Sequence, residues 1–212
     1  PYVMGSHATG CGAWCSGPED ISPDEYYWGY NRMTTVEGLF GAGDAVGGTP
    51  HAFSSGSFTE GRLAAKAACK YIDDGKADGI RVSDDQINRR KEEIYKPMET
   101  YTVGRNEIVA GSVNPNYINP RQGLDRLQKL MDEYCGGFGV NYMTNEKLLQ
   151  IGLKKMKTLE EDMEKIAAGD IHELLRAWEL NHRVRTSESV FQHTLFRYET
   201  RWPGYYYRGD AM

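Results

Sequence analysis

The amino-acid sequence predicts an α/β segment over residues 1–75 followed by a mainly α-helical bundle domain over residues 76–212. The first part is indicated by a short β-type run, a glycine-rich turn and a capped helix, in that order, between Thr34 and Tyr71. The second part is indicated by amphipathic stretches that begin with helix-capping residues. Because the chain becomes more charged after Gly75, we place the domain boundary there.

The first part contains the strongest local signals. Val36–Phe40 is a β-type run that predicts a short strand. The turn that follows is dense in glycine and carries one acidic residue, Asp44. After a loop of small polar residues, a capping-box pattern predicts a helix over Ser57–Asp74, and Gly75 ends it.

This order of features suits a site for an anionic or electron-rich ligand. Glycine lets the main chain approach a ligand closely. A helix N-terminus adds free N–H groups and about half a positive charge. An ordinary β-loop-α connection would also contain a glycine-rich turn. The combination of strand, turn, small-residue loop and capped helix favours the ligand-site interpretation.

Helix start and stop signals divide the second part. Ser83 begins a capping box, and we expect its helix to end at Pro97. Residues 100–118 have little periodicity and predict a long connection, with a candidate strand at Glu107–Ala110.

The remaining helices are predicted to form an antiparallel bundle. Asn119 caps a helix that starts with proline. Thr144 or Asn145 caps the next helix, which Gly169 closes, and Asp170 opens the last one. The predicted inner positions of the last helix are Leu174, Leu175, Trp178, Leu180 and Val184.

The composition of the chain indicates which classes of binding partner to expect. The net charge is −5 and no basic block occurs, which argues against a nucleic-acid polymer. No apolar run is long enough to cross a membrane, so direct membrane insertion is not expected, and no signal-peptide pattern opens the sequence. The spacing of Cys11 and Cys15 fits neither a redox motif nor a metal-ligand set, so no metal site is predicted. We expect reduced thiols in a cytoplasmic protein, with Cys69 packed in the first helix.

Three strings are long enough to be specific: YVMGSHATGCGAWCSGPED, GLFGAGDAVGGTPHAFSSGSFTEG and RYETRWPGYYYRGD. They resemble the fumarate reductase/succinate dehydrogenase flavoprotein superfamily, in which a GLFAAGE-type strand and turn precede an NSL-type helix start. Within that superfamily, the resemblance is to the flavin-carrying alpha subunits of dissimilatory adenylylsulfate reductases. It spans nearly the whole chain.

The resemblance implies an FAD site in the first part. Gly43 and Asp44 lie in the family's glycine turn, whose acid hydrogen-bonds the ribityl hydroxyls of FAD. Gly56, Ser57 and Phe58 match the NSL position, where backbone amides and the helix end face the pyrimidine side of the isoalloxazine ring. Positive potential there favours the anionic reduced flavin. The plainer alternatives are a turn former for Asp44 and a helix cap for Ser57.

Two histidines acquire roles only through the resemblance. His7, in HATGCG, takes the position of a histidine that lies over the flavin and contacts the substrate, which makes it the catalytic candidate. His51, in TPHAF, matches a histidine that precedes the flavin-contacting helix. In the related dicarboxylate enzymes an arginine follows this histidine; the stretch 52–55 contains none. This departure counts against fumarate or succinate as the substrate.

The C-terminal string resembles the superfamily's ending R-x-E-S-R-G-x-H-x-R-x-D. Its charged residues, between Arg197 and Asp210, are expected to interlock the helical region with the flavin domain. We favour this structural role over direct catalysis.

The function implied by the resemblance is the reversible two-electron reduction of adenosine 5′-phosphosulfate to AMP and sulfite through a flavin N5-sulfite adduct. Electrons would reach FAD from a separate iron–sulfur beta subunit, giving a heterodimer. No strand–GxGxxG–helix unit is present, so the chain is expected to be a C-terminal part of the flavoprotein subunit.

Two alternatives stay open from the sequence. One is a flavoprotein of the same superfamily that acts on a dicarboxylate. The other is a non-catalytic helical interaction module, for which residues 76–212 alone would suffice.

Overall fold

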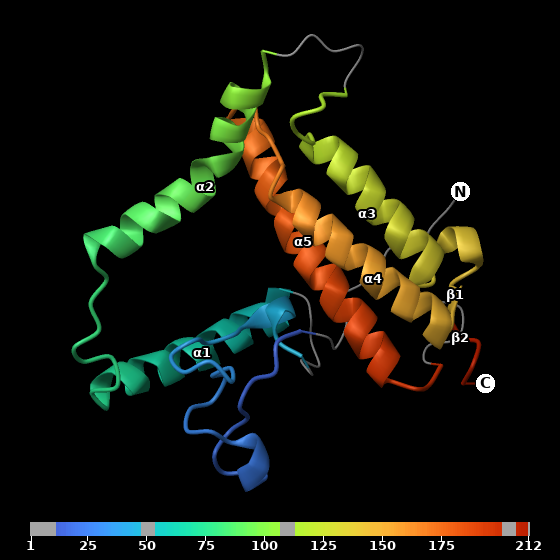
Figure 1. Cartoon of the computed structure of the whole chain (residues 1–212). Coiled ribbons are helices and arrows are strands. Elements are labelled where there is room, and N and C mark those ends of the chain that lie inside the picture. The colour runs from blue at the N-terminus through green and yellow to red at the C-terminus, as the bar shows by residue number, and fades with distance from the viewer. Residues whose placement is uncertain (1–11, 48–53, 107–112, 201–206, 212) are drawn as a thin grey trace. The chain divides into compact units, whose positions relative to one another are not determined.

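The computed structural model describes residues 12–47, 54–106, 113–200 and 207–211. The chain divides into two compact units, Pro1–Val82 and Ser83–Met212, which are described separately below. In the described parts of both units the regular structure is mainly helical (Figure 1).

The first unit combines an irregular β-like layer with one long helix. Its elements are the 3₁₀ turns η1 (Asp24–Tyr26) and η2 (Gly43–Ala45) and the helix α1 (Ser54–Asp73). Single β-bridges join Ala13 with Val46, Cys15 with Thr34, and Met33 with Phe40. The segment around residues 12–16 therefore pairs with the glycine turn at Val46 and with the segment around Thr34.

The predicted strand at Val36–Phe40 is wrong. The Leu39 N–H donates to the Val36 carbonyl at 3.1 Å, and Gly38 has a left-handed φ of +78°, so these residues form a tight turn. Only Phe40 takes part in a bridge. Val36 and Leu39 are 59% and 54% exposed, so these apolar side chains are not packed as they would be in a strand of a covered sheet.

The helix α1 begins at Ser54, before the predicted start at Ser57. The capping box predicted at Ser57 and Glu60 is therefore also wrong, because both residues lie inside the helix. The Glu60 carboxylate instead pairs with the Arg32 guanidinium. The predicted stop is confirmed to within one residue: α1 ends at Asp73, and Gly75 follows with a φ of +75°. Cys69, expected to pack, is exposed.

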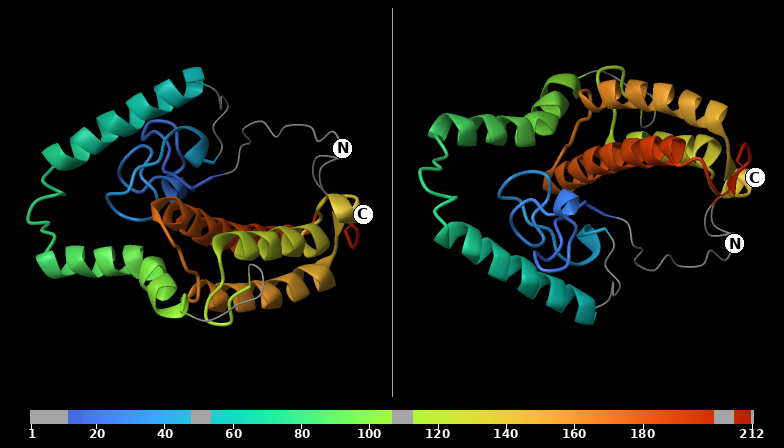
Figure 2. Two further views of the ribbon diagram at one scale, coloured as in Figure 1. Left: turned by 90° about the horizontal axis from the view of Figure 1, so that it is seen from above. Right: turned by 90° about the horizontal axis from the view of Figure 1, so that it is seen from below.

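The second unit contains a bundle of α3, α4 and α5, which lie side by side in antiparallel order (Figures 1 and 2). Short connections between successive helices favour this arrangement. Its core residues are Leu127, Leu130, Leu149, Met156, Leu159, Ile166, Ala177, Leu180, Val184 and Phe191. The elements of the unit are α2 (Asp84–Gly104), α3 (Pro120–Tyr134), η3 (Phe138–Val140), β1 (Met143–Thr144), α4 (Glu146–Met163), α5 (Ile171–Phe196) and β2 (Tyr207–Arg208).

The predicted N-caps of this unit are confirmed. Ser83 and Asn119 form capping boxes with Gln86 and Gln122. Asn145, rather than Thr144, caps α4, and Asp170 caps α5 through the Glu173 N–H at 2.8 Å. Each cap satisfies an N–H group that the helix itself leaves unpaired, a local interaction that the sequence alone can specify.

The predicted helix ends are less accurate. Pro97 lies inside α2 and does not end it, although α2 bends along its length (Figure 1). Two contacts hold the helix at this point: the Trp178 indole N–H donates to the Ile94 carbonyl at 3.0 Å, and the Ala168 N–H to the Pro97 carbonyl at 2.9 Å. Tertiary contacts thus offset the hydrogen bond that proline cannot make.

Two further differences concern the last helices. The helix α4 ends at Met163 rather than near Gly169, because the chain turns to bury Ile166, which bridges Ile118. Of the predicted inner positions of α5, Leu174, Leu180 and Val184 are buried, whereas Leu175 is 60% exposed. The candidate strand at Glu107–Ala110 lies in the stretch 107–112, outside the described residues.

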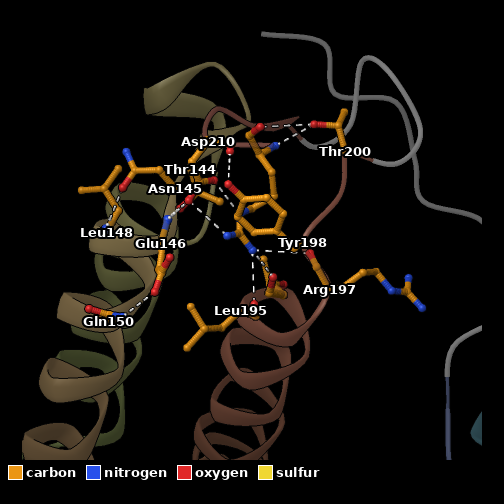
Figure 3. A network of polar contacts seen from close by, with 12 residues as sticks. Thr144, Asn145, Glu146, Leu148, Gln150, Leu195, Arg197, Tyr198, Thr200 and Asp210 are labelled. Atoms are coloured by element: carbon orange, nitrogen blue, oxygen red, sulfur yellow. Dashed lines mark hydrogen bonds and ion pairs between the residues drawn. The ribbon is translucent and has the colours of Figure 1, made fainter. Parts of the chain in front are cut away.

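A network of polar contacts that includes Glu146, Tyr198 and Asp210 lies at one end of the bundle (Figure 3). Arg208 is fully buried, and its strand β2 pairs in parallel with β1. Its Nη1 donates to the Thr194 carbonyl at 2.6 Å, near the end of α5. The central carbon of its guanidinium group lies 5.1 Å from the centre of the Tyr198 ring. Its Nε donates to the Asp210 carboxylate at 2.8 Å.

Asp210 extends this contact to a second helix. Its Oδ2 accepts from the Glu146 N–H at 2.7 Å, at the start of α4. Arg208 and Asp210 therefore link the C-terminus of α5 to the N-terminus of α4, with the charges that suit those helix ends. The hydrogen bond from Arg208, with that from the Glu146 N–H, holds the pKa of Asp210 well below its usual range.

This depressed pKa gives a testable dependence of stability on pH. The stabilisation by Asp210 is fully present above the unfolded-state pKa of about 3.9 and is lost as the pH falls below it. We expect Asp210→Asn to lower the free energy of unfolding at pH 7, and the gap to wild type to narrow at about pH 3. Urea denaturation at both pH values measures this.

The matched control is Asp125→Asn, which removes a partner of the exposed Arg121 in α3. We expect its effect to be below about 1 kcal/mol at either pH. A gap between wild type and Asp210→Asn that stays constant from pH 7 to pH 3 would contradict the assignment.

Candidate functional site

The candidate site consists of the glycine turn and the first turns of α1, both in the first unit. Five of the predicted site residues lie there: Gly43, Asp44, Gly56, Ser57 and Phe58. The other two, His7 and His51, lie outside the described residues.

The glycine turn packs directly on α1. Gly43 has a left-handed φ of +64°, and a Cβ built on it would lie 3.2 Å from the Ser57 Oγ. Glycine is required here both for the backbone conformation and for the close approach. The structure therefore brings the two predicted halves of the site together, although they are separated in the sequence.

Residues 12 and 13 also hold the glycine turn, through backbone contacts. The Ala13 N–H donates to the Ala45 carbonyl at 2.7 Å, and the Gly47 N–H donates to the Ala13 carbonyl at 3.0 Å. Gly12 lies so close that a Cβ would be 2.7 Å from the Ala45 carbonyl oxygen. Because three stretches of chain meet at η2, the position of the turn is well determined by backbone contacts.

The first turn of α1 has the electrostatics of an anion-binding helix end. It contains no acidic residue, and Ser54, Ser55 and Ser57 are exposed. The N–H groups of the first three helical residues have no carbonyl partner within the helix, so the amides of residues 54–56 carry the partial positive charge. The earlier helix start moves the Phe58 amide into the helix ladder, while its side chain is 81% exposed.

A charged pair beside this site was missed in the sequence. Glu60 is 5% exposed and pairs with Arg32. The available signal was its position: Glu60 lies four residues after Gly56 and four before Ala64, on the face that α1 buries. A carboxylate at such a position needs a cationic partner.

The described residues contain neither a metal-ligand cluster nor a membrane-spanning helix. No group of three or more His, Cys, Asp or Glu side chains is placed to hold a metal ion among them. Within the same residues, every helix is too short or too polar to span a bilayer.

Comparison with known proteins shows a strong similarity over the whole chain. The chain is 44% identical over 222 aligned positions to the adenylylsulfate reductase subunit alpha of Megalodesulfovibrio gigas, a match that covers all of this chain. The chain is homologous to adenylylsulfate reductase alpha subunits. It spans 33% of the length of that relative. No protein-family model matches the chain.

Solved adenylylsulfate reductases share both sequence and fold with the chain. The structure of the enzyme from the hyperthermophilic Archaeoglobus fulgidus matches 99% of this chain and 33% of its own, with 54% identity and a TM-score of 0.90. An adenosine-5-phosphosulfate reductase in complex with sulfite, as a covalent adduct, matches with the same identity and TM-score.

More distant structures share the fold alone. The Sdh1 of Mycobacterium smegmatis in complex with UQ1 covers 82% of this chain, with 22% identity and a TM-score of 0.57. A quinol-fumarate reductase with menaquinol molecules covers 84%, with 21% identity and a TM-score of 0.54. The fold of this chain is therefore similar to parts of these two structures as well.

The contact between Gly43 and Ser57 can be tested separately from backbone strain. We expect Gly43→Ala to add the strain of a left-handed alanine, about 1–2 kcal/mol, and to push η2 away from α1. The rate of proteolytic cleavage between residues 41 and 58 should rise.

The matched control is Gly79→Ala. Gly79 has a similar φ of +77°, but a Cβ there would have no neighbour within 4 Å. If both variants are cleaved between residues 41 and 58 at the same rate, the close packing of η2 on α1 is not what fixes the turn.

Proposed function

We propose that this chain is part of an adenylylsulfate reductase alpha subunit that binds FAD and catalyses the reversible two-electron reduction of adenosine 5′-phosphosulfate to AMP and sulfite. The observation that carries the proposal is the 54% identity and TM-score of 0.90 to solved adenylylsulfate reductases, one of them a covalent sulfite adduct. Because the chain spans a third of those proteins, the activity belongs to the larger protein.

The candidate site fits a flavin. Gly43 has no side chain between the turn and Ser57, and the serines of the first α1 turn are exposed. Backbone amides at both places can therefore approach a planar, electron-rich ring. Bound FAD would supply the two electrons that reduce sulfur.

The residues of this chain would hold and polarise the reactants. The electropositive start of α1 at residues 54–56 favours the anionic reduced flavin, and Asp44 accepts hydrogen bonds from the ribityl hydroxyls. His51 and Phe58 border the same helix start in the sequence. These assignments extend the geometry of η2 and α1 to a ligand.

His7 is the proposed catalytic residue. In the forward direction the bond between the sulfo sulfur and the AMP phosphate oxygen breaks, two electrons reduce the sulfur, and AMP and sulfite leave. A protonated imidazole steadies the negative charge of the sulfo group and of the departing phosphate oxygen. The chain itself keeps His7 within about 18 Å of Gly12, which contacts the glycine turn.

The proposal includes an iron–sulfur beta subunit as electron donor and a cytoplasmic location. The name of the relative, subunit alpha, supports the existence of a second subunit. Free Cys15, Cys69 and Cys135 support a reducing compartment. We propose the heterodimer as the functional unit.

The test is a His7→Ala variant of the intact enzyme. We expect unchanged flavin absorbance and a fall in adenosine 5′-phosphosulfate turnover of about 10²-fold or more, the usual contribution of a positioned acid–base group. His172→Ala, an exposed histidine near the start of α5, is the matched control and should behave as wild type.

Normal turnover by His7→Ala would contradict the catalytic assignment. A wild-type enzyme that contains no flavin, or one that reduces fumarate and not adenosine 5′-phosphosulfate, would contradict the proposed function.

A further inference from the structure

We propose that Arg32 and Glu60 are positioning residues of the flavin site, because their ion pair fixes the first turns of α1 against the glycine turn and keeps that helix end electropositive. This inference rests on the proposed function, since it concerns the same flavin. It assigns a role to two residues that are not among the predicted flavin-site residues.

Glu60 is buried, Arg32 is half-buried, and two contacts join them. The side chains of Arg32 and Glu60 are 19% and 7% exposed. The Arg32 Nε pairs with one Glu60 oxygen, and Nη2 donates to the other at 2.9 Å. A guanidinium that engages both carboxylate oxygens fixes orientation as well as distance. Removing either partner leaves a poorly hydrated charge behind, which is strongly unfavourable.

The backbone of Arg32 is attached to the glycine turn. Its carbonyl accepts from the Gly41 N–H at 2.9 Å, and its own N–H donates to the Ser16 carbonyl at 2.8 Å. Arg32 has a left-handed φ of +64°, a conformation that a residue with a side chain keeps only when its surroundings impose it. This conformation accompanies a side chain that reaches α1.

The carboxylate partner lies one turn after the helix end that faces the proposed flavin. Glu60 and Gly56 occupy the same buried face of α1, and Ser57 between them lies against Gly43. One residue, Arg32, thus binds the start of the glycine turn through its backbone and α1 through its side chain. A rotation or shift of α1 would change both the Gly43–Ser57 contact and the direction of the first-turn amides.

The pair also sets the sign of the local field. Unpaired, the Glu60 carboxylate would oppose the positive end of the helix dipole one turn away. Arg32 neutralises it. Removing Arg32 should therefore disfavour the anionic reduced flavin, whereas removing Glu60 leaves a cation and should favour it. A residue pair that served stability alone would shift the flavin in the same direction in both variants.

The experiment uses the intact enzyme with Arg32→Gln and with Glu60→Gln. FAD is removed and added back to measure its dissociation constant, and the reduction potential is measured on the flavin that remains bound. We expect the dissociation constant to rise about tenfold or more in both variants. We expect the potential to fall in Arg32→Gln and to rise in Glu60→Gln.

Three further variants make the result specific. Lys70→Gln and Asp74→Asn break an exposed ion pair of 2.7 Å at the C-terminal end of α1, and both should retain the wild-type affinity and potential. Arg32→Lys keeps the charge but loses the two-point contact, so it should restore the potential and only part of the affinity. This conservative variant also provides a readout if Arg32→Gln does not fold.

The proposal requires both results. Wild-type affinity in Arg32→Gln, Glu60→Gln or, if Arg32→Gln is unfolded, Arg32→Lys would overturn it, as would potentials that shift in the same direction. Wild-type enzyme that binds no FAD would overturn the proposed function together with this inference, whereas flavin-loaded wild type with variants that match the Lys70 and Asp74 controls would overturn this inference alone.

Discussion

The close packing of the glycine turn on the first turn of α1 is the interaction on which the rest of the first unit depends. It is possible only because Gly43 has no Cβ and adopts a left-handed conformation beside Ser57. Hydrogen bonds from residues 13 and 47 fix the turn on one side. The ion pair between Arg32 and Glu60 holds α1 against the turn. The backbone amides of the glycine turn and of the start of α1 are therefore held in fixed positions. Fixed groups support a ligand better than a mobile loop does.

In the second unit, too, a few specific contacts determine how the elements are placed. Polar groups at helix ends are satisfied by specific side chains: Asn145 and Asp170 at the starts of α4 and α5, and Arg208 at the end of α5. The apolar core holds the helices together, and these polar contacts determine which ends meet. The C-terminal string thus has its structural role within the helical unit, and its proposed interlock with the flavin domain remains a prediction.

The sequence predicted what local interactions determine. The caps at Ser83 and Asn119 involve residues three apart, so their pattern suffices. Features that depend on distant partners were not predictable in this way. Val36–Phe40 forms a turn instead of a strand, and α2 continues past Pro97 beside contacts from Trp178 and Ala168. Glu60 was interpreted as a cap because Arg32 is far away in the sequence. The site residues of η2 and α1 came from a family motif, and the structure adds how close they are.

The central claim is that flavin binds at the glycine turn and the first turn of α1. Hydrogen exchange of the amides of residues 43–45 and 54–56, measured in the intact subunit with and without FAD, tests it most directly. These helix-end amides have no carbonyl partner within α1 and should exchange rapidly without ligand. The account predicts that FAD slows their exchange about tenfold or more, while the α1 amides beyond Glu60 change little. Equal exchange rates with and without FAD at both segments would contradict it.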